Sequence, residues 1–300
     1  MKDKNKGHSD LQNTKSGSLY IVATPIGNLE DITLRALKIL KRVNLIAAES
    51  VQHAKGLLQY HGIKTRLTRY NQHNRKVKGP ELIKKLKSGY DIALITNAGT
   101  PGVSDPGLTL ISRATEEEIK VSPIPGPSAV TAAVSVSGLP GDKFLFLGFL
   151  PNRSGKRKKA LRNLADEPGT VVFFEAPHRI QDMLMDLKET LGDRRIVAVR
   201  EQTKLHEEVI RGSVTDVLEH LKGGKIRGEF TLVMAGTMKN EEAPSLDEMT
   251  RKRIEKMVTE GKMSIKDIAA ELSVKTGMAY RFVYRECLSI KRGVMTLEND

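Results

Sequence analysis

From Ser18 onward the chain alternates short apolar runs with amphipathic segments, and this alternation limits the folds that it can adopt. Residues 19–23, 43–48 and 92–95 have the length and composition of buried strands. The stretch after Asp31, a suitable N-cap residue, carries leucines at helical spacing. Strand and helix units that repeat in this way are typical of a parallel sheet with right-handed crossovers, so we predict an α/β fold.

The same pattern divides the chain into domains. Gly138-Leu-Pro-Gly141 interrupts the alternation, and we place a boundary there. Strands expected at 195–200 and 207–211 follow one another without an intervening helix, which predicts a mixed sheet in the second domain. The predicted divisions are a disordered tail over 1–17, α/β domains over 18–140 and 141–236, a polar linker over 237–244 and a helical domain over 245–300.

Further elements are predicted within each domain. In the first domain they are strands at 66–70 and 120–124 and helices at 53–60, 81–86 and 129–137. In the second they are strands at 143–149, 170–174 and 229–234 and helices at 156–164, 179–190 and 214–221. Near the C-terminus, residues 264–278 and the amphipathic stretch after them are similar to a helix-turn-helix, which either contacts nucleic acid or serves as helical scaffolding.

Composition narrows the class of protein. A length of 300 residues with 39% hydrophobic residues suits one large or two medium domains. The longest apolar stretches are too short to span a bilayer and no signal-peptide pattern opens the chain, so we expect a soluble, cytoplasmic protein without membrane contact. The single cysteine, Cys287, excludes an intramolecular disulfide and a cysteine-based zinc site, and we expect no metal.

The net charge of +13 is concentrated in two clusters. Nine Lys or Arg and one acid lie between residues 64 and 87, and six basic residues and no acid lie between residues 153 and 162. Either cluster alone could be a solvated surface, but two on so basic a chain favour a polyanionic partner. Aromatic residues make up only 4% and tryptophan is absent, so we expect few stacking platforms for free bases.

Several common ligand motifs are absent from the sequence. No Gly-x-Gly-x-x-Gly follows the first strand, and Gly155-Lys156 lacks the rest of a P-loop. Neither His-Glu-x-x-His nor Gly-x-Ser-x-Gly occurs. Nicotinamide cofactors, P-loop nucleotide hydrolysis and the commonest metalloprotease and hydrolase mechanisms are therefore not expected.

Three loops rich in glycine and proline follow predicted strands instead, at residues 24–28, 97–107 and 125–128. Ligands of open α/β sheets bind beyond the carboxyl ends of the strands, so these loops form a candidate binding edge, although each alone could be a simple turn. The third loop brings Ser128 to a helix N-terminus, where it could cap the helix or leave free amides for a carboxylate.

Charged residues gather at strand ends in the second domain. Glu175, His178 and Arg179 lie in one short stretch, and Lys204 follows the strand at 195–200. Arg179 could simply pair with Glu175 in a structural salt-bridge network. The alternative is that these residues belong to a functional site.

In this order along the chain, the motifs resemble the family of 16S rRNA (cytidine-2′-O)-methyltransferases known as small subunit methyltransferase I, within the tetrapyrrole methylase superfamily. The similar segments span residues 18–236, and the C-terminal segment is similar to the small extra domain of that family. They are Leu19–Ile32, Ala98–Pro101, Ser104–Gly107, Pro125–Ser128, Phe144–Pro151, Glu175–Arg179 and the pair Glu201 and Lys204.

The resemblance implies two α/β domains of the tetrapyrrole methylase type with S-adenosylmethionine in the cleft between them, usually in a homodimer. It implies a substrate, a cytidine ribose of 16S rRNA in the decoding centre of the small ribosomal subunit. The implied cofactor contacts are Pro25, Gly27, Asn28, Asn97, Ala98, Gly99, Thr100, Pro101, Pro125, Gly126, Pro127 and Ser128. RNA phosphate becomes the partner of the basic residues, with Arg75, Lys76, Lys78, Arg153, Lys156, Arg157, Lys158 and Arg179 as candidates.

The chain departs from the family pattern at three acidic positions. Ser50, Arg75 and Asn97 stand where the family usually has a carboxylate. Two other interpretations therefore stay open. One is methylation of a small-molecule tetrapyrrole on the same fold, and the other is an RNA-binding homologue that has lost turnover.

A ribose hydroxyl is a poor nucleophile at neutral pH, so a positioned base or a cation should assist methyl transfer. Glu175 and Lys204 are the first candidates because both follow strands in the domain that faces the cofactor loops. The other candidates are Glu49, His53 and His178.

Overall fold

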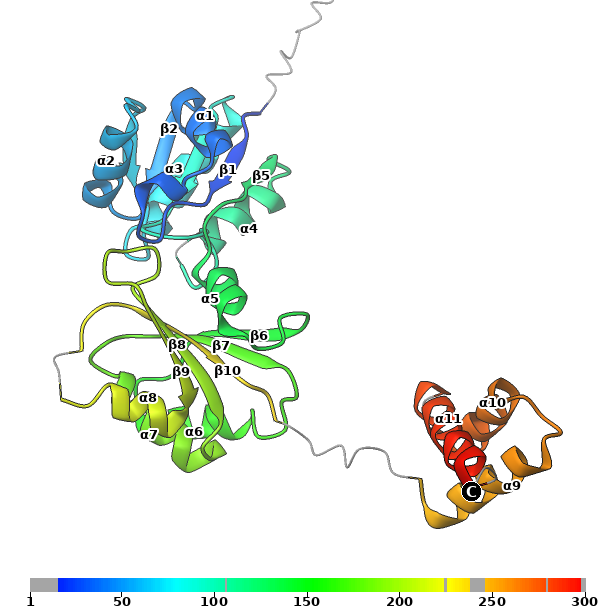
Figure 1. Ribbon diagram of the computed structural model, residues 1–300. Coiled ribbons are helices and arrows are strands. Elements are labelled where there is room, and N and C mark those ends of the chain that lie inside the picture. The colour runs from blue at the N-terminus through cyan, green and yellow to red at the C-terminus, as the bar shows by residue number, and fades with distance from the viewer. Residues whose placement is uncertain (1–15, 106, 224–225, 238–245, 279, 298–300) are drawn as a thin grey trace, which may run out of the picture. The chain divides into compact units, whose positions relative to one another are not determined.

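The computed structural model describes residues 16–105, 107–223, 226–237, 246–278 and 280–297 (Figure 1). The chain forms two compact units, Met1–Thr237 and Met238–Asp300. The larger unit contains two five-stranded sheets, which confirms the predicted α/β class. The predicted tail over 1–17 and linker over 237–244 lie outside the described residues, apart from positions 16, 17 and 237.

The first sheet is parallel throughout, in the order β3-β2-β4-β1-β5. Its strands are β1 (Leu19–Val22), β2 (Leu45–Ala48), β3 (Leu67–Arg69), β4 (Ile92–Ile95) and β5 (Val121–Ile124). Helices α1 (Leu34–Arg42) and α2 (Val51–Tyr60) pack on one face, and α3 (Arg75–Lys87) and α4 (Leu108–Glu116) pack on the other. Because the strands are parallel, the loops after β1, β4 and β5 meet at one edge of the sheet.

The first helix begins later than its sequence predicts. Thr33 is the N-cap of α1, and its hydroxyl accepts a hydrogen bond from the Ala36 amide at 3.1 Å. Asp31 lies instead in a short 3₁₀ helix, η1 (Leu29–Asp31), which Asn28 caps. The prediction of Asp31 as N-cap was wrong, because the chain makes this extra turn before α1 starts.

The second sheet has the order β6-β7-β10-β8-β9. Its strands are β6 (Phe144–Phe149), β7 (Thr170–Glu175), β8 (Arg195–Arg200), β9 (Glu208–Ser213) and β10 (Phe230–Met234). Only β6 and β7 pair in parallel, and the other three pairs are antiparallel, which confirms the mixed sheet. Helices α6 (Ser154–Arg162), α7 (Ile180–Leu191) and α8 (Val214–His220) cover one face.

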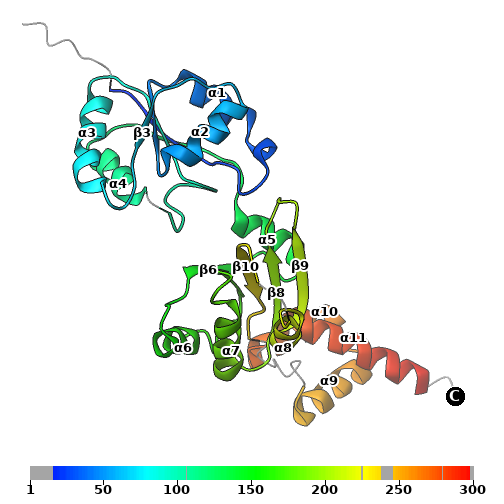
Figure 2. The same ribbon diagram turned by 90° about the vertical axis from the view of Figure 1, so that its left-hand side faces the viewer.

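Helix α5 (Ala129–Ser137) covers the other face of the second sheet (Figure 2). Its residues Val130 and Ala133 pack against valines of β7, β8 and β10. The predicted boundary near residue 140 assigned this helix to the first domain, whereas its core contacts assign it to the second. The glycine at 138, in the left-handed conformation, marks the end of α5 and not the end of a domain.

The smaller unit is helical, as predicted. It contains α9 (Glu248–Glu260), α10 (Ile265–Thr276) and α11 (Tyr280–Leu297), packed around a core that includes Ile254, Ile268 and the buried Cys287. The α10 helix is capped at its C-terminal end by Gly277 in the left-handed conformation. Among the described residues, no helix is sufficiently long and apolar to cross a membrane, and no cluster of His, Cys, Asp and Glu is arranged to hold a metal ion.

Candidate active site

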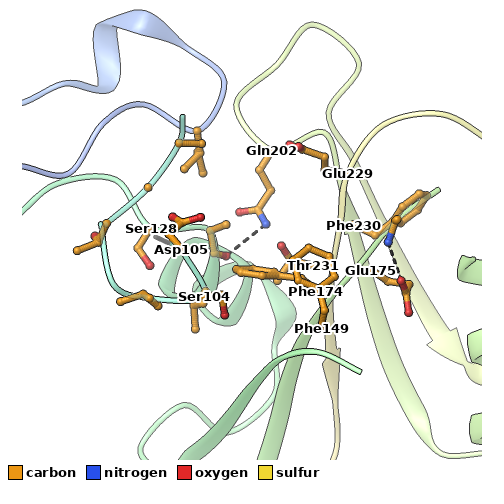
Figure 3. A pocket seen from close by; sticks show the side chains of 18 of the residues that line it. Ser104, Asp105, Ser128, Phe149, Phe174, Glu175, Gln202, Glu229, Phe230 and Thr231 are labelled. Carbon is orange, nitrogen blue, oxygen red and sulfur yellow. Dashed lines mark hydrogen bonds between the residues drawn. The ribbon is translucent and has the colours of Figure 1, made fainter. Parts of the chain in front are cut away.

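A cavity of about 380 Å³ lies within the larger unit, at the edge where the loops of the first sheet meet the second sheet (Figure 3). The loop after β4 contributes residues between Ala98 and Asp105, and the start of α5 contributes Ser128, Ala129 and Val130. The second sheet contributes residues of β6, β7 and β10 and of the loop between β8 and β9. This volume falls in the range of small-molecule sites.

Close backbone contacts join the two sides of the cavity. Asn28 donates its amide to Thr203 Oγ1 at 3.0 Å. A Cβ at Gly27 would lie 2.6 Å from Lys204 Cγ and 2.7 Å from the Gln202 carbonyl oxygen, so only glycine fits there. Thr24 and Gly99 pair as an antiparallel bridge and tie the loop after β1 to the loop after β4. Gly27 and Asn28 therefore pack the loops together.

Four of the predicted cofactor residues line the cavity: Ala98, Gly99, Thr100 and Ser128. Ser128 makes no side-chain capping bond, so the first amides of α5 have no side-chain acceptor from it. The other predicted residues belong to the same loops but are not among those that line the cavity. They are Pro25, Gly27, Asn28, Asn97, Pro101, Pro125, Gly126 and Pro127.

Gln202 presents an unsatisfied acceptor to the cavity. Its Nε2 donates to the Ala129 carbonyl oxygen at 3.3 Å, and its side chain is buried. Its Oε1 is also buried and accepts no hydrogen bond from any described residue. A buried oxygen of this kind normally has a partner, so its place in the cavity wall suits a ligand that donates a hydrogen bond. Gln202 is not among the residues predicted from the sequence.

Asp105 is a second cavity residue that is not among those predicted from the sequence. Burial and, to a smaller extent, the nearby charge of Glu49 raise the pKa of this carboxyl to about 6, although a hydrogen bond with the Thr96 side chain partly opposes the shift. Glu49 is itself fixed, because its Oε2 accepts the Asn97 amide at 3.1 Å. The signal for Asp105 was its place in the Ser104–Gly107 motif directly beyond β4.

Glu175, a first candidate for catalysis, is fully committed to structural partners. Its side chain is 0% exposed, and Arg179 Nε lies 3.0 Å from Oε1. The Ala176 amide also donates to Oε1, at 2.8 Å, and Arg179 Nη2 donates to Oε2 at 3.0 Å. The structural ion pair that the sequence left open is therefore present, and Arg179 is only 15% exposed at its side chain.

Lys204, the other first candidate, lines the cavity but is also paired. Its Nζ lies 2.9 Å from Glu201 Oε1 and 3.1 Å from Glu229 Oε2. Burial alone would lower the pKa of Lys204, but the hydrogen bonds to the two glutamates outweigh it and raise the pKa above its ordinary value. The ammonium thus stays charged at neutral pH and is not a proton acceptor.

The two candidate histidines lie outside the cavity lining. His53 is exposed on α2, where it lines a separate and more open groove with Ser50 and Gln52. His178 is exposed just before α7. Neither reaches the cavity that contains Asp105.

The predicted phosphate contacts differ in exposure. Arg75, Lys76, Arg153 and Lys156 are exposed, whereas Lys78 and Lys158 are paired with Glu81 and Glu189. Arg157 is only 3% exposed. Its guanidinium lies 2.5 Å from Asp186 Oδ2, on the face of α6 that also buries Leu161. The prediction that Arg157 contacts RNA was wrong, because its position on the helix points it into the core.

Comparison with known proteins identifies the family. The sequence model of the Tetrapyrrole (Corrin/Porphyrin) Methylases matches residues 18–218. The chain belongs to this family. Among solved structures, a cobalt precorrin-4 methyltransferase has a TM-score of 0.58 at 16% identity, and the uroporphyrin-III-C-methyltransferase from Thermus thermophilus has 0.52 at 22% identity. Each likeness covers 73% of this chain and 94% of the other, and confirms the predicted tetrapyrrole methylase fold.

More similar relatives narrow the family further. A ribosomal RNA small subunit methyltransferase I from Thermotoga maritima is 46% identical over 73% of this chain and 99% of its own length. Proteins of the same name from Synechocystis and Bacillus subtilis are 40% and 39% identical over 92% and 93% of this chain, and over 99% and 94% of their own lengths. The chain is thus a member of this methyltransferase family, which confirms the resemblance found in its motifs.

Proposed function

We propose that this tetrapyrrole methylase family member transfers a methyl group from S-adenosylmethionine to the 2′-hydroxyl of a cytidine in the decoding centre of 16S rRNA. The name of its relatives supports ribosomal RNA as the substrate class. The choice of cytidine and of its ribose follows from the family resemblance. The main structural support for methyl transfer is that Asp105, a carboxylate with a raised pKa, lies in the wall of the cavity.

The residues of the cavity fit S-adenosylmethionine by the chemistry of their polar groups. The unpaired Gln202 Oε1 suits an amino group, and the first amides of α5 beside Ser128 suit a carboxylate. The Thr100 amide completes the proposed contacts, since both backbone groups of Gly99 are paired with Thr24. When bound, this cofactor supplies a methyl group on a positively charged sulfur, which is an electrophile for a ribose oxygen.

The protein's own task is to align the acceptor hydroxyl, keep water away and take up its proton. A carboxylate with a pKa of about 6 is ionised at neutral pH and more basic than an ordinary aspartate. We therefore assign proton uptake to Asp105, whose pKa is kept high by burial and, to a smaller extent, by Glu49. Glu175 and Lys204 become positioning residues, because both are held in ion pairs.

Charge supports a polyanionic substrate. The exposed side chains of Arg75, Lys76, Arg153 and Lys156 are the proposed phosphate contacts. Binding through phosphates releases counterions and weakens with salt, whereas transfer to a small tetrapyrrole has no such dependence. A homodimer and a cytoplasmic location stay predictions from the sequence.

The direct test uses isotopically labelled S-adenosylmethionine and small ribosomal subunits that lack the modification, followed by mass spectrometry of the nucleosides. We expect label in 2′-O-methylcytidine with the wild-type protein and a large loss of rate with Asp105→Asn. Label in no RNA nucleoside refutes the proposal. Label in an added tetrapyrrole would support the rival interpretation, and RNA binding without methyl transfer would support a homologue that has lost turnover.

A further inference from the structure

Phe149 is an exposed aromatic residue in the cavity wall. The residue is 56% exposed at the end of β6, and its side chain borders the cavity (Figure 3). The residues on either side of it, Gly148 and Leu150, are both buried. The ring is therefore exposed although the backbone on either side of it is packed. Its exposure leaves a large apolar face uncovered at a site for polar ligands.

An irregularity of β6 places the ring where it is. β6 pairs in register with β7 as far as Phe146, and the register shifts between Phe146 and Phe149. Gly148, inside this bulge, has a φ of +63°, and a Cβ there would lie 2.6 Å from Ser104 Oγ. Bulges redirect side chains, and glycine permits the close approach. The bulge thus brings Phe149 beside the loop that carries Asp105.

Two further contacts hold the ring in place. Phe174 of β7 lies at a tilt behind it, with ring centroids 5.6 Å apart. The next residue, Leu150, accepts a hydrogen bond at its carbonyl oxygen from Arg179 Nη2 at 2.9 Å. Arg179 is in turn fixed by the buried Glu175. This ion pair, which has no direct part in the proton transfer, keeps the strand end rigid.

We propose that Phe149, supported by Phe174, is the platform on which the base of the target nucleotide stacks while its ribose lies beside Asp105. The inference rests on the proposed function and assigns a residue to base recognition. A nucleotide must leave its stack to place a 2′-hydroxyl in a cavity, and an aromatic face replaces the lost stacking. Although aromatic residues are few in this chain, one at this position is sufficient.

The surroundings favour the base of RNA over the adenine of the cofactor. The acceptors and amides that suit the cofactor belong to Gln202 and the start of α5, whereas Phe149 follows Gly148, the residue that packs against Ser104. Helix α6 begins at Ser154, shortly after β6, and the exposed cations Arg153 and Lys156 lie at that end. A nucleotide stacked on the ring would therefore have phosphate partners close along the chain.

The sequence offers a clean test, because it contains no tryptophan. Phe149→Trp gives the protein a single tryptophan at this position, and the tryptophan-free wild-type protein serves as the blank for emission from the subunits. Phe144→Trp is the matched control, on the same strand, 39% exposed and outside the cavity lining. We expect unmethylated small subunits to quench the indole emission of Phe149→Trp and to leave the control unchanged. Quenching by S-adenosylhomocysteine alone, or cosedimentation with subunits without quenching, overturns the proposal.

Kinetics give a second readout. Phe149→Leu should lower kcat/KM for subunits about five- to a hundredfold, the range of base stacking on an aromatic ring, with the affinity for S-adenosylhomocysteine unchanged. Phe149→Tyr should retain most of the activity. Wild-type rates with Phe149→Leu refute the stacking role of Phe149 and leave the proposed function standing. A wild-type protein that neither binds nor methylates subunits refutes the proposed function, and the stacking role with it.

Discussion

Replacing Asp105 by asparagine should make the protein more stable while it removes the proton acceptor. A carboxyl whose pKa is raised by folding binds its proton more tightly in the folded chain than in the unfolded chain. Its ionisation therefore opposes folding. This cost is absent well below pH 3.8, grows as the pH rises, and is complete above a pH of about 6. Asparagine keeps the shape of the side chain and never ionises.

The size of the effect follows from the displacement of the pKa. A rise of the pKa from the ordinary value of 3.8 to about 6 means that ionisation of Asp105 lowers the free energy of unfolding by at most about 3 kcal/mol at neutral pH. Asp105 is only partly buried, so solvent screening reduces this figure, and we expect Asp105→Asn to gain about 1 kcal/mol. Such a gain at the expense of activity is the usual trade-off at a strained active site.

Urea unfolding of the wild-type protein and of Asp105→Asn, at neutral pH and at a series of acid pH values, measures this difference. The stability gain should shrink as the pH falls through the window from about 6 to 3.8. Single-turnover methyl transfer by the wild-type protein should rise through the same window, and Glu49→Gln should move the midpoint to lower pH. A variant that is less stable than wild type at neutral pH, or a rate that is flat across this window, refutes the assignment.

Three further predictions concern α6 and the contact between Gly27 and the loop that joins β8 to β9. Arg157→Ala leaves Asp186 buried without its partner and should cost about 3 kcal/mol in urea unfolding, whereas Lys156→Ala should change stability by less than about 0.5 kcal/mol. In RNA binding the exposed lysine should matter more than the buried arginine. Lys156→Ala should reduce the slope of the log binding constant against log salt concentration by about one, and Arg157→Met should leave that slope unchanged. Equal slopes for the two variants contradict the assignment. Gly27→Ala places a Cβ against Lys204 and should slow methyl transfer about tenfold or more. The circular dichroism spectrum should stay unchanged. Wild-type rates would show that the contact between the two loops tolerates the added methyl group.

The sequence predicted the features that depend on local pattern. Apolar runs and helical spacing identified the strands of both sheets, and the glycine-rich loops identified the edge that carries the cavity. The errors have physical causes. Arg157 was treated as part of a charge run, although its spacing of four residues from Leu161 places both on the buried face of α6. The Ser104–Gly107 motif contains Asp105, but the sequence does not show its raised pKa, which arises from burial and from Glu49, a residue distant in sequence.

The glycine-rich loops were predicted only as ligand contacts or simple turns, because local sequence does not show which part of the protein packs against a glycine. A glycine in a loop at a strand end predicts a close approach, but the sequence does not say what approaches. At Gly27 it is the loop after β8, and at Gly148 it is Ser104. Both contacts join a loop of the first sheet to the second sheet, so the absent Cβ atoms permit the close approach that brings Asp105, Gln202 and Phe149 to one cavity. The proposed chemistry requires a base, a cofactor site and a stacking surface at one place, and neither sheet supplies all three. If the proposed chemistry takes place here, these glycines contribute to it by permitting the junction between the two sheets.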